Sequence, residues 1–258
     1  MREYISARHS KIINTVNERG TVSVQDLCQM FDVSPLTIRR DLAYLESINL
    51  ISRYHGGACS LNLSPITSFG DTFYNKINQQ AEEKKRIGKK AAEFVMDNDI
   101  VFMNSGTTVL QFLNALNSKL KLTIVTNNAA VTQHPLGENI SILMLGGEFH
   151  SQLCSYSGEL TIQNINDIYS SVAILGVNAL DFERGIMTSY YQECGVNNAM
   201  INHCRGKVII LADHTKIGKL SHFVSSPLSQ INIVITDNAC PTAYISELES
   251  RGIQVVTV

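Results

Sequence analysis

Three kinds of feature are missing from this 258-residue sequence, and each absence removes a class of protein. No two of its six cysteines have the Cys-x-x-Cys spacing of a zinc finger, so we expect reduced thiols that serve as packing residues. No apolar run approaches the roughly 18 residues of a membrane span, and the N-terminal segment lacks the apolar core of a signal peptide. We therefore expect a cytoplasmic protein without membrane contact.

An excess of positive charge is missing as well. The formal net charge is −2 at pH 7, so composition alone does not predict nucleic-acid binding. Residues 1–58 hold seven Lys or Arg against six Asp or Glu. This net charge of +1 is too small to indicate DNA binding. The content of 44% hydrophobic and 17% charged residues is typical of folded globular proteins and excludes extensive disorder. An argument for DNA binding must therefore depend on where the arginines lie.

The N-terminal part of the chain has the pattern of a helix-turn-helix followed by a β-hairpin. Apolar periodicity and capping residues predict helices over residues 5–18, 24–31 and 35–48, and an alternating pattern predicts two strands within residues 50–61. The third helix has the clearest start, because Ser34 supplies a capping hydroxyl and Pro35 takes the first helical position. Ile38, Leu42 and Leu45 share one face of this helix, and we expect that face to be buried.

Because the apolar face is buried, the other side chains in the N-terminal part of the third helix are free to enter a DNA major groove. Thr37 and Arg40 are three residues apart and share a face, and arginine suits guanine because its two donors match O6 and N7. Arg39 fits a phosphate contact, and Arg53 with the turn after it would form a wing against the sugar-phosphate backbone. The predicted DNA-binding residues are Ser34, Thr37, Arg39, Arg40, Arg53, His55, Gly56 and Gly57.

The alternative for the arginine pair is that it forms only the solvated side of an amphipathic helix. The Ser-Pro helix start, the preceding helix and turn, and the glycine hairpin that follows together favour DNA binding over this alternative.

The rest of the chain predicts a second domain of α/β class. Residues 60–75 are polar, contain Pro65 and Gly70 and show no period, so we expect them to link two domains. Seven short runs rich in Val, Ile and Leu then alternate with helical patterns, which favours a parallel sheet buried on both faces. The expected domains are a winged helix-turn-helix over 1–59, a linker over 60–75, and an effector-sensing and oligomerisation domain over 76–258.

Four stretches of the second domain have residues suited to an anion or a sugar. Ser-Gly-Thr-Thr at 105–108 follows a strand and opens a helix, where backbone amides and hydroxyls can converge on an oxyanion. Residues 126–128 and the Asp213–Lys216 segment also follow strands, where open α/β sheets bind ligands. Gly146-Gly147 would allow a close approach. An ordinary strand-to-helix turn with a capping hydroxyl is the alternative explanation for residues 105–108, and a plain turn is the alternative for Gly146-Gly147.

The string VSPLTIRRDLAYLESINLISRYHGGA resembles the signature of the DeoR family of bacterial sugar-metabolism regulators. The resemblance extends over the second domain through EKKRIGKKAA, SGTT, TNN, LGG and LADHTKIG. It implies a winged helix-turn-helix and a sensor domain that is similar to ribose-5-phosphate isomerase and binds a phosphorylated sugar. The effector-binding residues it implies are Lys84, Ser105, Gly106, Thr107, Thr108, Thr126, Asn127, Asn128, Gly146, Gly147, Glu193, Asp213 and Lys216.

Two positions depart from the pattern of this family. Asn104 stands where many members have Asp, so a carboxylate that could bind a sugar hydroxyl is missing. Asn197-Asn198 replace a pair of basic residues. Both departures bear on the identity of the ligand.

The resulting hypothesis is a repressor of a carbohydrate-utilisation operon that a phosphorylated sugar releases from double-stranded operator DNA. Because repressors commonly read two half-sites, we expect a homo-oligomer, either a dimer or a tetramer. Activation instead of repression stays open from the sequence.

Two alternative hypotheses, an enzyme and a metal sensor, have less support in the sequence. A sugar-phosphate isomerase or deaminase could use Glu193, Asp213 and Lys216 as acid–base groups, but no paired-carboxylate or nucleophile–base motif is present. A metal sensor would need His203, Cys204 and His214 to converge. We therefore expect no catalytic residue, no metal and no cofactor.

Overall fold

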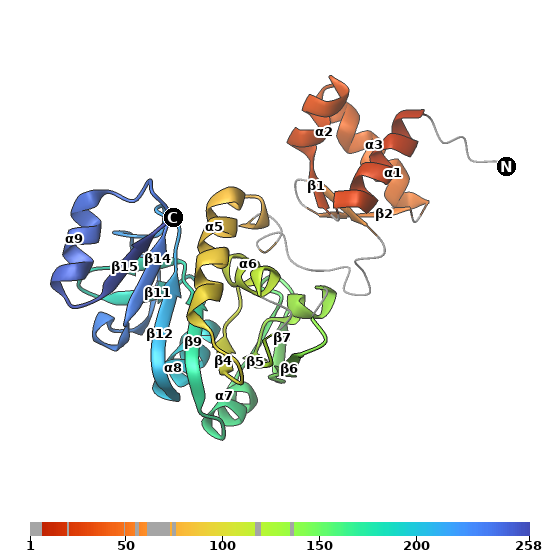
Figure 1. The fold of residues 1–258 in the computed structure, drawn as a ribbon. Coiled ribbons are helices and arrows are strands. Elements are labelled where there is room, and N and C mark those ends of the chain that lie inside the picture. Colours follow the sequence, from red (N-terminus) through yellow and green to blue (C-terminus); the bar gives the residue numbers. More distant parts are fainter. Residues whose placement is uncertain are drawn as a thin grey trace. The chain divides into compact units, whose positions relative to one another are not determined.

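The computed structural model describes residues 7–19, 21–48, 50–54, 57–60, 73, 76–116, 120–134 and 137–258. The chain divides into two compact units, Met1–Asn75 and Lys76–Val258 (Figure 1). Within the described ranges, no helix combines the length and the apolarity that crossing a bilayer requires.

The N-terminal unit contains three helices and a small antiparallel sheet. In chain order the elements are α1 (Ala7–Arg19), β1 (Thr21–Ser23), α2 (Val24–Phe31), α3 (Pro35–Ser47), β2 (Ile51–Tyr54) and β3 (Gly57–Ser60). The strand order is β1-β3-β2, so β1 adds a third strand to the predicted hairpin. The three helices and the hairpin were predicted from the sequence, and the structure confirms them.

Capping and apolar spacing account for the positions of α2 and α3. The Ser23 hydroxyl accepts a hydrogen bond from the Asp26 backbone at the start of α2, and the Ser34 hydroxyl accepts one from Thr37 at the start of α3. The predicted inward face of α3 is confirmed, because its three apolar side chains are fully buried in the core of this unit. That core contains Ile12, Val16, Val22, Leu27, Ile38, Leu42, Leu45, Ile51 and Ala58.

The C-terminal unit is built on a seven-stranded parallel sheet with the order β15-β14-β12-β9-β4-β5-β6. The strands are β4 (Ile100–Met103), β5 (Leu122–Thr126), β6 (Ile140–Met144), β9 (Ser170–Gly176), β12 (Cys204–Leu211), β14 (Ile233–Thr236) and β15 (Gln254–Thr257). Each of the seven apolar runs in the sequence forms one of these strands. The predicted α/β class is therefore correct.

Helices cover the sheet (Figure 1). They are α5 (Ala81–Ala91), α6 (Thr107–Ala115), α7 (Glu159–Asn166), α8 (Tyr191–Asn202) and α9 (Thr242–Ser250), with short 3-10 turns at Ala92–Phe94, Ala129–Gln133 and Leu228–Gln230. Helix α5 packs against α6, and α7 packs against α8. Val196 and Met200 of α8 join Phe102, Leu175 and Ile210 of the sheet in one apolar core.

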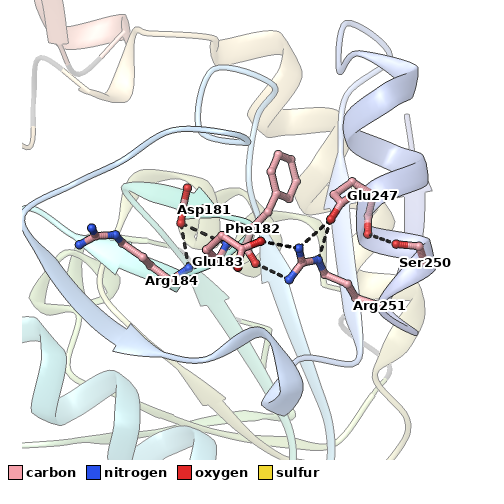
Figure 2. Close-up of polar contacts among 7 residues, drawn as sticks. All are labelled: Asp181, Phe182, Glu183, Arg184, Glu247, Ser250 and Arg251. Atoms are coloured by element: carbon pink, nitrogen blue, oxygen red, sulfur yellow. Dashed lines mark hydrogen bonds and ion pairs between the residues drawn. The ribbon is translucent and has the colours of Figure 1, made fainter.

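Two small antiparallel sheets were not predicted from the sequence. One pairs β7 (Glu148–His150) with β8 (Ser155–Ser157), and the other joins β10 (Ala179–Asp181), β11 (Gly185–Thr188) and β13 (Phe223–Ser226). Figure 2 shows how the turn between β10 and β11 is fastened to α9. The Arg251 guanidinium donates to the Phe182 carbonyl at 2.6 Å and to the carboxylates of Glu183 and Glu247 at 2.9 and 2.7 Å.

Candidate functional site

The outer face of α3 carries two exposed arginines. Arg39 and Arg40 are exposed, and within the described part of the chain neither side chain forms a hydrogen bond or an ion pair. Leu36 is also exposed, and the Thr37 hydroxyl lies 2.9 Å from the Ser34 hydroxyl. The side chains predicted to face DNA therefore point away from the core of their unit, and the arginine donors are available to an outside acceptor.

The residue next to this pair, Asp41, is buried and fixes α3 to α1. Its carboxylate accepts hydrogen bonds from Arg8 Nε at 2.6 Å and Nη2 at 3.0 Å, and lies 3.1 Å from His9 Nε2. Burial would raise the pKa of Asp41, but the hydrogen bonds from Arg8 and His9 outweigh it and hold the pKa below its usual value. Sequence reasoning missed this role, although an acid three residues after buried Ile38 on a helix indicates a paired partner.

The predicted wing is connected to the same helix. Glu46 of α3 accepts a hydrogen bond from the Arg53 backbone at 3.0 Å and forms a 2.7 Å ion pair with Arg53 Nε. Arg53 therefore has an intramolecular partner, unlike the arginines of α3. Gly57 begins β3 and pairs with Tyr54, while the predicted residues His55 and Gly56 lie outside the described residues.

In the C-terminal unit, the predicted effector-binding stretches meet along one edge of the parallel sheet. Residues 105–108 follow β4, residues 126–128 lie at the end of β5, Gly146-Gly147 follow β6, and residues 213–216 follow β12. The carboxyl ends of parallel strands share one edge, which is the usual ligand side of an open α/β sheet. The structure thus brings together stretches that are more than 100 residues apart in the sequence.

The turn before α6 has donors that the described protein leaves unused. Gly106 is the N-cap residue with φ of 143°, a backbone conformation that favours glycine, and no side chain caps the helix. The hydroxyls of Thr107 and Thr108 form no hydrogen bond with other described residues. A helix N-terminus with free hydroxyls suits an anionic oxygen.

Buried charges lie around the segment that follows β12. Lys84 of α5 is only 5% exposed, and its ammonium donates to the carbonyl of Lys76. Burial lowers the pKa of Lys84 to about 8, with nearby Asp213 opposing the shift and Lys216 and Lys76 adding to it. Asp213 is itself buried and accepts a hydrogen bond from the Thr215 backbone at 3.0 Å. The cluster therefore contains more positive than negative charge near Lys84.

Glu193 projects from the first turn of α8 toward the same turn. Its carboxylate accepts hydrogen bonds from the hydroxyls of Thr188 and of Ser105, the latter at 3.2 Å. Burial raises the pKa of Glu193, and the hydrogen bonds and the charges of Lys76 and His150 oppose this rise. Lys76, His150 and Thr188 were not predicted as site residues, and Lys76 and His150 belong to no recognisable motif.

Thr126, Asn127 and Asn128 are buried, and their side chains form hydrogen bonds mainly with neighbouring backbone groups. The Thr126 hydroxyl accepts from the Asn128 backbone at 3.0 Å, and Asn127 Nδ2 donates to the Tyr156 carbonyl at 2.8 Å. Asn128 Nδ2 donates to the Gly106 carbonyl at 3.3 Å, which ties the end of β5 to the turn before α6. Asn127 Oδ1 is buried and accepts no hydrogen bond from the described residues. The hydrogen bonds of these three residues therefore mainly fix the end of β5.

The Gly146-Gly147 pair fits a packing requirement. A Cβ on Gly147 would lie 2.1 Å from the Thr161 hydroxyl, and the backbone there has φ of 146°. Thr161 in turn donates to the Gly146 carbonyl at 2.7 Å. The close approach of α7 explains Gly147 without a ligand, whereas a Cβ on Gly146 would meet no atom within 4 Å.

The two departures from the family pattern touch each other. Asn104 Nδ2 donates to Asn197 Oδ1 at 2.8 Å, and both side chains are buried. Asn104 Oδ1 accepts from the Gly176 backbone at 2.8 Å, so this amide clamps β4 to β9 and α8. Asn104 is therefore engaged within the protein, and the two positions at which the resemblance predicts charged residues carry hydrogen-bonded amides.

No group of three or more His, Cys, Asp and Glu residues is placed to hold a metal ion in the part of the chain that the structure describes. Cys204 Sγ lies 3.6 Å from the Lys207 carbonyl, and His214 Nδ1 lies 2.8 Å from a carboxylate oxygen of buried Asp237.

Comparison with known proteins gives matches over both units. The profile described as DeoR-like helix-turn-helix domain matches residues 8–63, and the one described as DeoR C terminal sensor domain matches residues 79–238. The glycerol-3-phosphate regulon repressor of Escherichia coli (strain K12) is 34% identical over 249 residues, which are 96% of this chain and 97% of the repressor.

A second curated relative is the lactose phosphotransferase system repressor of Streptococcus mutans serotype c, which is 33% identical over 89% of this chain and 91% of its own length. Among solved structures, ribose 5-phosphate isomerase A from Neisseria gonorrhoeae matches with 19% identity and a TM-score of 0.37, covering 56% of each chain.

Proposed function

The chain belongs to the DeoR family of transcriptional regulators, and from this we propose that it represses a carbohydrate-utilisation operon and leaves its operator when a phosphorylated sugar binds. The observation that carries the proposal is the outer face of α3, where Arg39 and Arg40 are exposed and have no hydrogen-bond or ion-pair partner among the described residues. Such a face is suited to the major groove, and an arginine whose donors are free can read guanine.

The proposed DNA-binding residues divide into those that contact base edges and those that contact the DNA backbone or hold the helix and the wing in place. Thr37 and Arg40 contact base edges, and Arg39 contacts a phosphate. Ser34 caps α3, and Arg53, His55, Gly56 and Gly57 form the wing. Arg53 is held by Glu46, so its contact with the DNA backbone requires it to be shared between that carboxylate and a phosphate.

The effector site lies at the carboxyl edge of the parallel sheet. The phosphate is bound by Lys84 and Lys216, which supply positive charge, and by the turn 105–108, which supplies free donors. Glu193 and Asp213 accept hydrogen bonds from sugar hydroxyls. Residues 126–128 with Gly146 and Gly147 shape the site at the ends of β5 and β6. The names of the relatives, which mention glycerol 3-phosphate and a lactose phosphotransferase system, agree with a small phosphorylated ligand.

The full regulator is a homo-oligomer of two or four chains, because two recognition helices are needed to read two half-sites. Residues 1–59 bind DNA, residues 60–75 link the domains, and residues 76–258 sense the effector and assemble the oligomer. The protein acts in the cytoplasm, where the operator is. Its curated relatives are repressors, and the chain is a regulator and not an enzyme.

An effector titration tests this proposal. An operator duplex is first selected from a random pool with the purified protein, and its binding is followed by fluorescence anisotropy while phosphorylated sugars are added at constant ionic strength. Release by one phosphorylated sugar and not by its unphosphorylated parent supports the proposal, with a coupling of about 1–3 kcal/mol. Selection of no preferred duplex, or indifference to the whole panel, contradicts it.

A further inference from the structure

Lys76 occupies a particular place in the chain, because it is the first residue of the C-terminal unit and directly follows the segment that leads from the DNA-binding domain. Its side chain is half-buried. The ammonium lies 5.9 Å from the centre of the Tyr190 ring, which is a cation–π distance. Tyr190 is the residue that precedes α8, and its carbonyl accepts from the Glu193 backbone at 3.1 Å.

The backbone of Lys76 is held by the effector site itself. The carbonyl of Lys76 accepts a hydrogen bond from the Lys84 ammonium, and Lys84 is the buried lysine beside Asp213 and Lys216. An ammonium group has three donors, so Lys84 can serve a ligand oxygen and the Lys76 carbonyl together. A ligand that binds the Lys84 ammonium therefore affects the hydrogen bond to Lys76, the residue at which the linker enters the sensor domain.

The charges around Lys76 favour an anion at the same place. Lys76, Lys84 and Lys216 interact with one another and with two carboxylates, those of Glu193 and Asp213. Burial lowers the pKa of Lys76, Glu193 opposes this, and Lys216 adds to it. Three ammonium groups against two carboxylates leave one positive charge that a bound phosphate would compensate.

We propose that Lys76 is a further anion-binding residue of the effector site and couples ligand binding to the linker. This inference rests on the proposed function and adds to it the residue at which the signal leaves the sensor domain. A ligand can shift an equilibrium only through contacts that differ between the two states. We expect the contact to Lys76 to differ between the DNA-bound and the released protein, because the chain that it holds continues to the DNA-binding domain.

The test uses inorganic phosphate as the probe and the full chain throughout. Phosphate affinity is measured by isothermal titration calorimetry for the wild type, Lys76→Met, Lys76→Gln and Lys76→Arg, with Lys85→Met as the matched control. Lys85 is an exposed lysine of α5, next to Lys84 in the sequence. Chloride keeps the ionic strength constant, and circular dichroism shows which variants are folded.

We expect Lys76→Met and Lys76→Gln to bind phosphate about tenfold more weakly, because each loses one charged contact. Lys76→Arg and Lys85→Met should stay within about twofold of the wild type. Hydrogen exchange of the amides of residues 77–79 supplies a second readout: phosphate should slow it in the wild type and in Lys76→Arg, and should leave it unchanged in Lys76→Met. Normal phosphate affinity in both the Met and the Gln variants would overturn the assignment of Lys76 alone. Failure of the wild type to bind phosphate would overturn both this assignment and the proposed effector site.

Discussion

Asn104 and Asn197 are 93 residues apart in the sequence, and one hydrogen bond of 2.8 Å joins their buried amides. Asn104 continues from β4 into the turn before α6, and Asn197 lies on α8. Asn197 Nδ2 also donates to the Ser225 hydroxyl at 3.3 Å, so a chain of neutral groups runs from Gly176 through both amides to β13. Where the family resemblance predicts an acid and a base, this protein has a pair of amides.

This pairing predicts that charge at either position is tolerated only together with charge at the other. Asn104→Asp places an uncompensated carboxylate in a buried site, and we expect it to lower the free energy of unfolding by about 1–3 kcal/mol. Urea unfolding followed by circular dichroism measures the change.

The double variant Asn104→Asp with Asn197→Lys completes this experiment as a double-mutant cycle. It should recover part of the loss, because the new ammonium faces the new carboxylate. Additive effects of the two substitutions would show that the two positions are not coupled in solution.

Asp41 should stabilise the DNA-binding unit without contacting DNA. Replacing it with Asn removes the charge that Arg8 and His9 share, and we expect a loss of about 1–2 kcal/mol. Because the pKa of Asp41 is lowered in the folded protein, its stabilising effect is complete above the ordinary pKa of Asp and is lost as the pH falls through the lowered value.

The measurement for Asp41 is thermal unfolding of the full chain from pH 7 to pH 2, with hydrogen exchange of the α1 and α3 amides to locate the effect. Wild type and Asp41→Asn should converge in acid. A difference that is constant over the whole range would contradict the ion pair as its cause.

The buried charge of Lys84 should lower the free energy of unfolding of the unliganded protein, while the same charge is needed to bind the ligand. Its pKa of about 8 lies below the ordinary 10.5, so the unfolded chain binds more protons between these values and the free energy of unfolding rises with pH there. At pH 7, Lys84→Met removes a buried charge, and we expect the unliganded protein to become about 1–3 kcal/mol more stable while phosphate binding is lost. Thr215 still satisfies Asp213 in this variant.

Chemical denaturation at pH 7 and at pH 10 separates this effect from simple packing. The advantage of Lys84→Met should shrink at the higher pH, at which Lys84 of the wild type is largely neutral. An advantage that does not change with pH would assign it to packing of the methionine.

Lys216 should matter for induction and not for DNA binding. Lys216→Ala removes one ammonium from the cluster around Lys84, and we expect unchanged operator affinity but a response to effector that is weaker by about tenfold. Anisotropy titrations with and without effector measure both quantities. Loss of operator binding in a folded Lys216→Ala protein would place the residue in contacts between subunits instead.

The sequence predicted the large elements well because each has its own local signal. Strands of the parallel sheet are buried on both faces and read as continuous apolar runs, and the start of α3 is marked by Ser34 and Pro35. The strands β7, β8 and β10 have three residues each and pair locally, so they produce no such run.

The candidate site was predicted in part, for a physical reason. Residues such as Asp213 and Lys216 follow strands and could be placed from topology alone, whereas the contact between Asn104 and Asn197 depends on how α8 crosses the sheet. Lys76 stands alone in a polar stretch and has no motif. Its role follows only from its neighbours in space.

The most direct test of the account is the DNA preference of Arg40→Ala. Anisotropy with the selected operator and with a shuffled duplex gives the affinity ratio, and repeating it at several salt concentrations gives the salt slope. Arg19→Ala, an exposed arginine of α1, is the matched control. We predict that Arg40→Ala loses the preference for the operator, with a cost of about 1–3 kcal/mol on that duplex, while Arg39→Ala weakens both duplexes evenly and lowers the salt slope by about 1. Full operator preference in a folded Arg40→Ala protein would contradict the assignment of α3 as the helix that reads DNA.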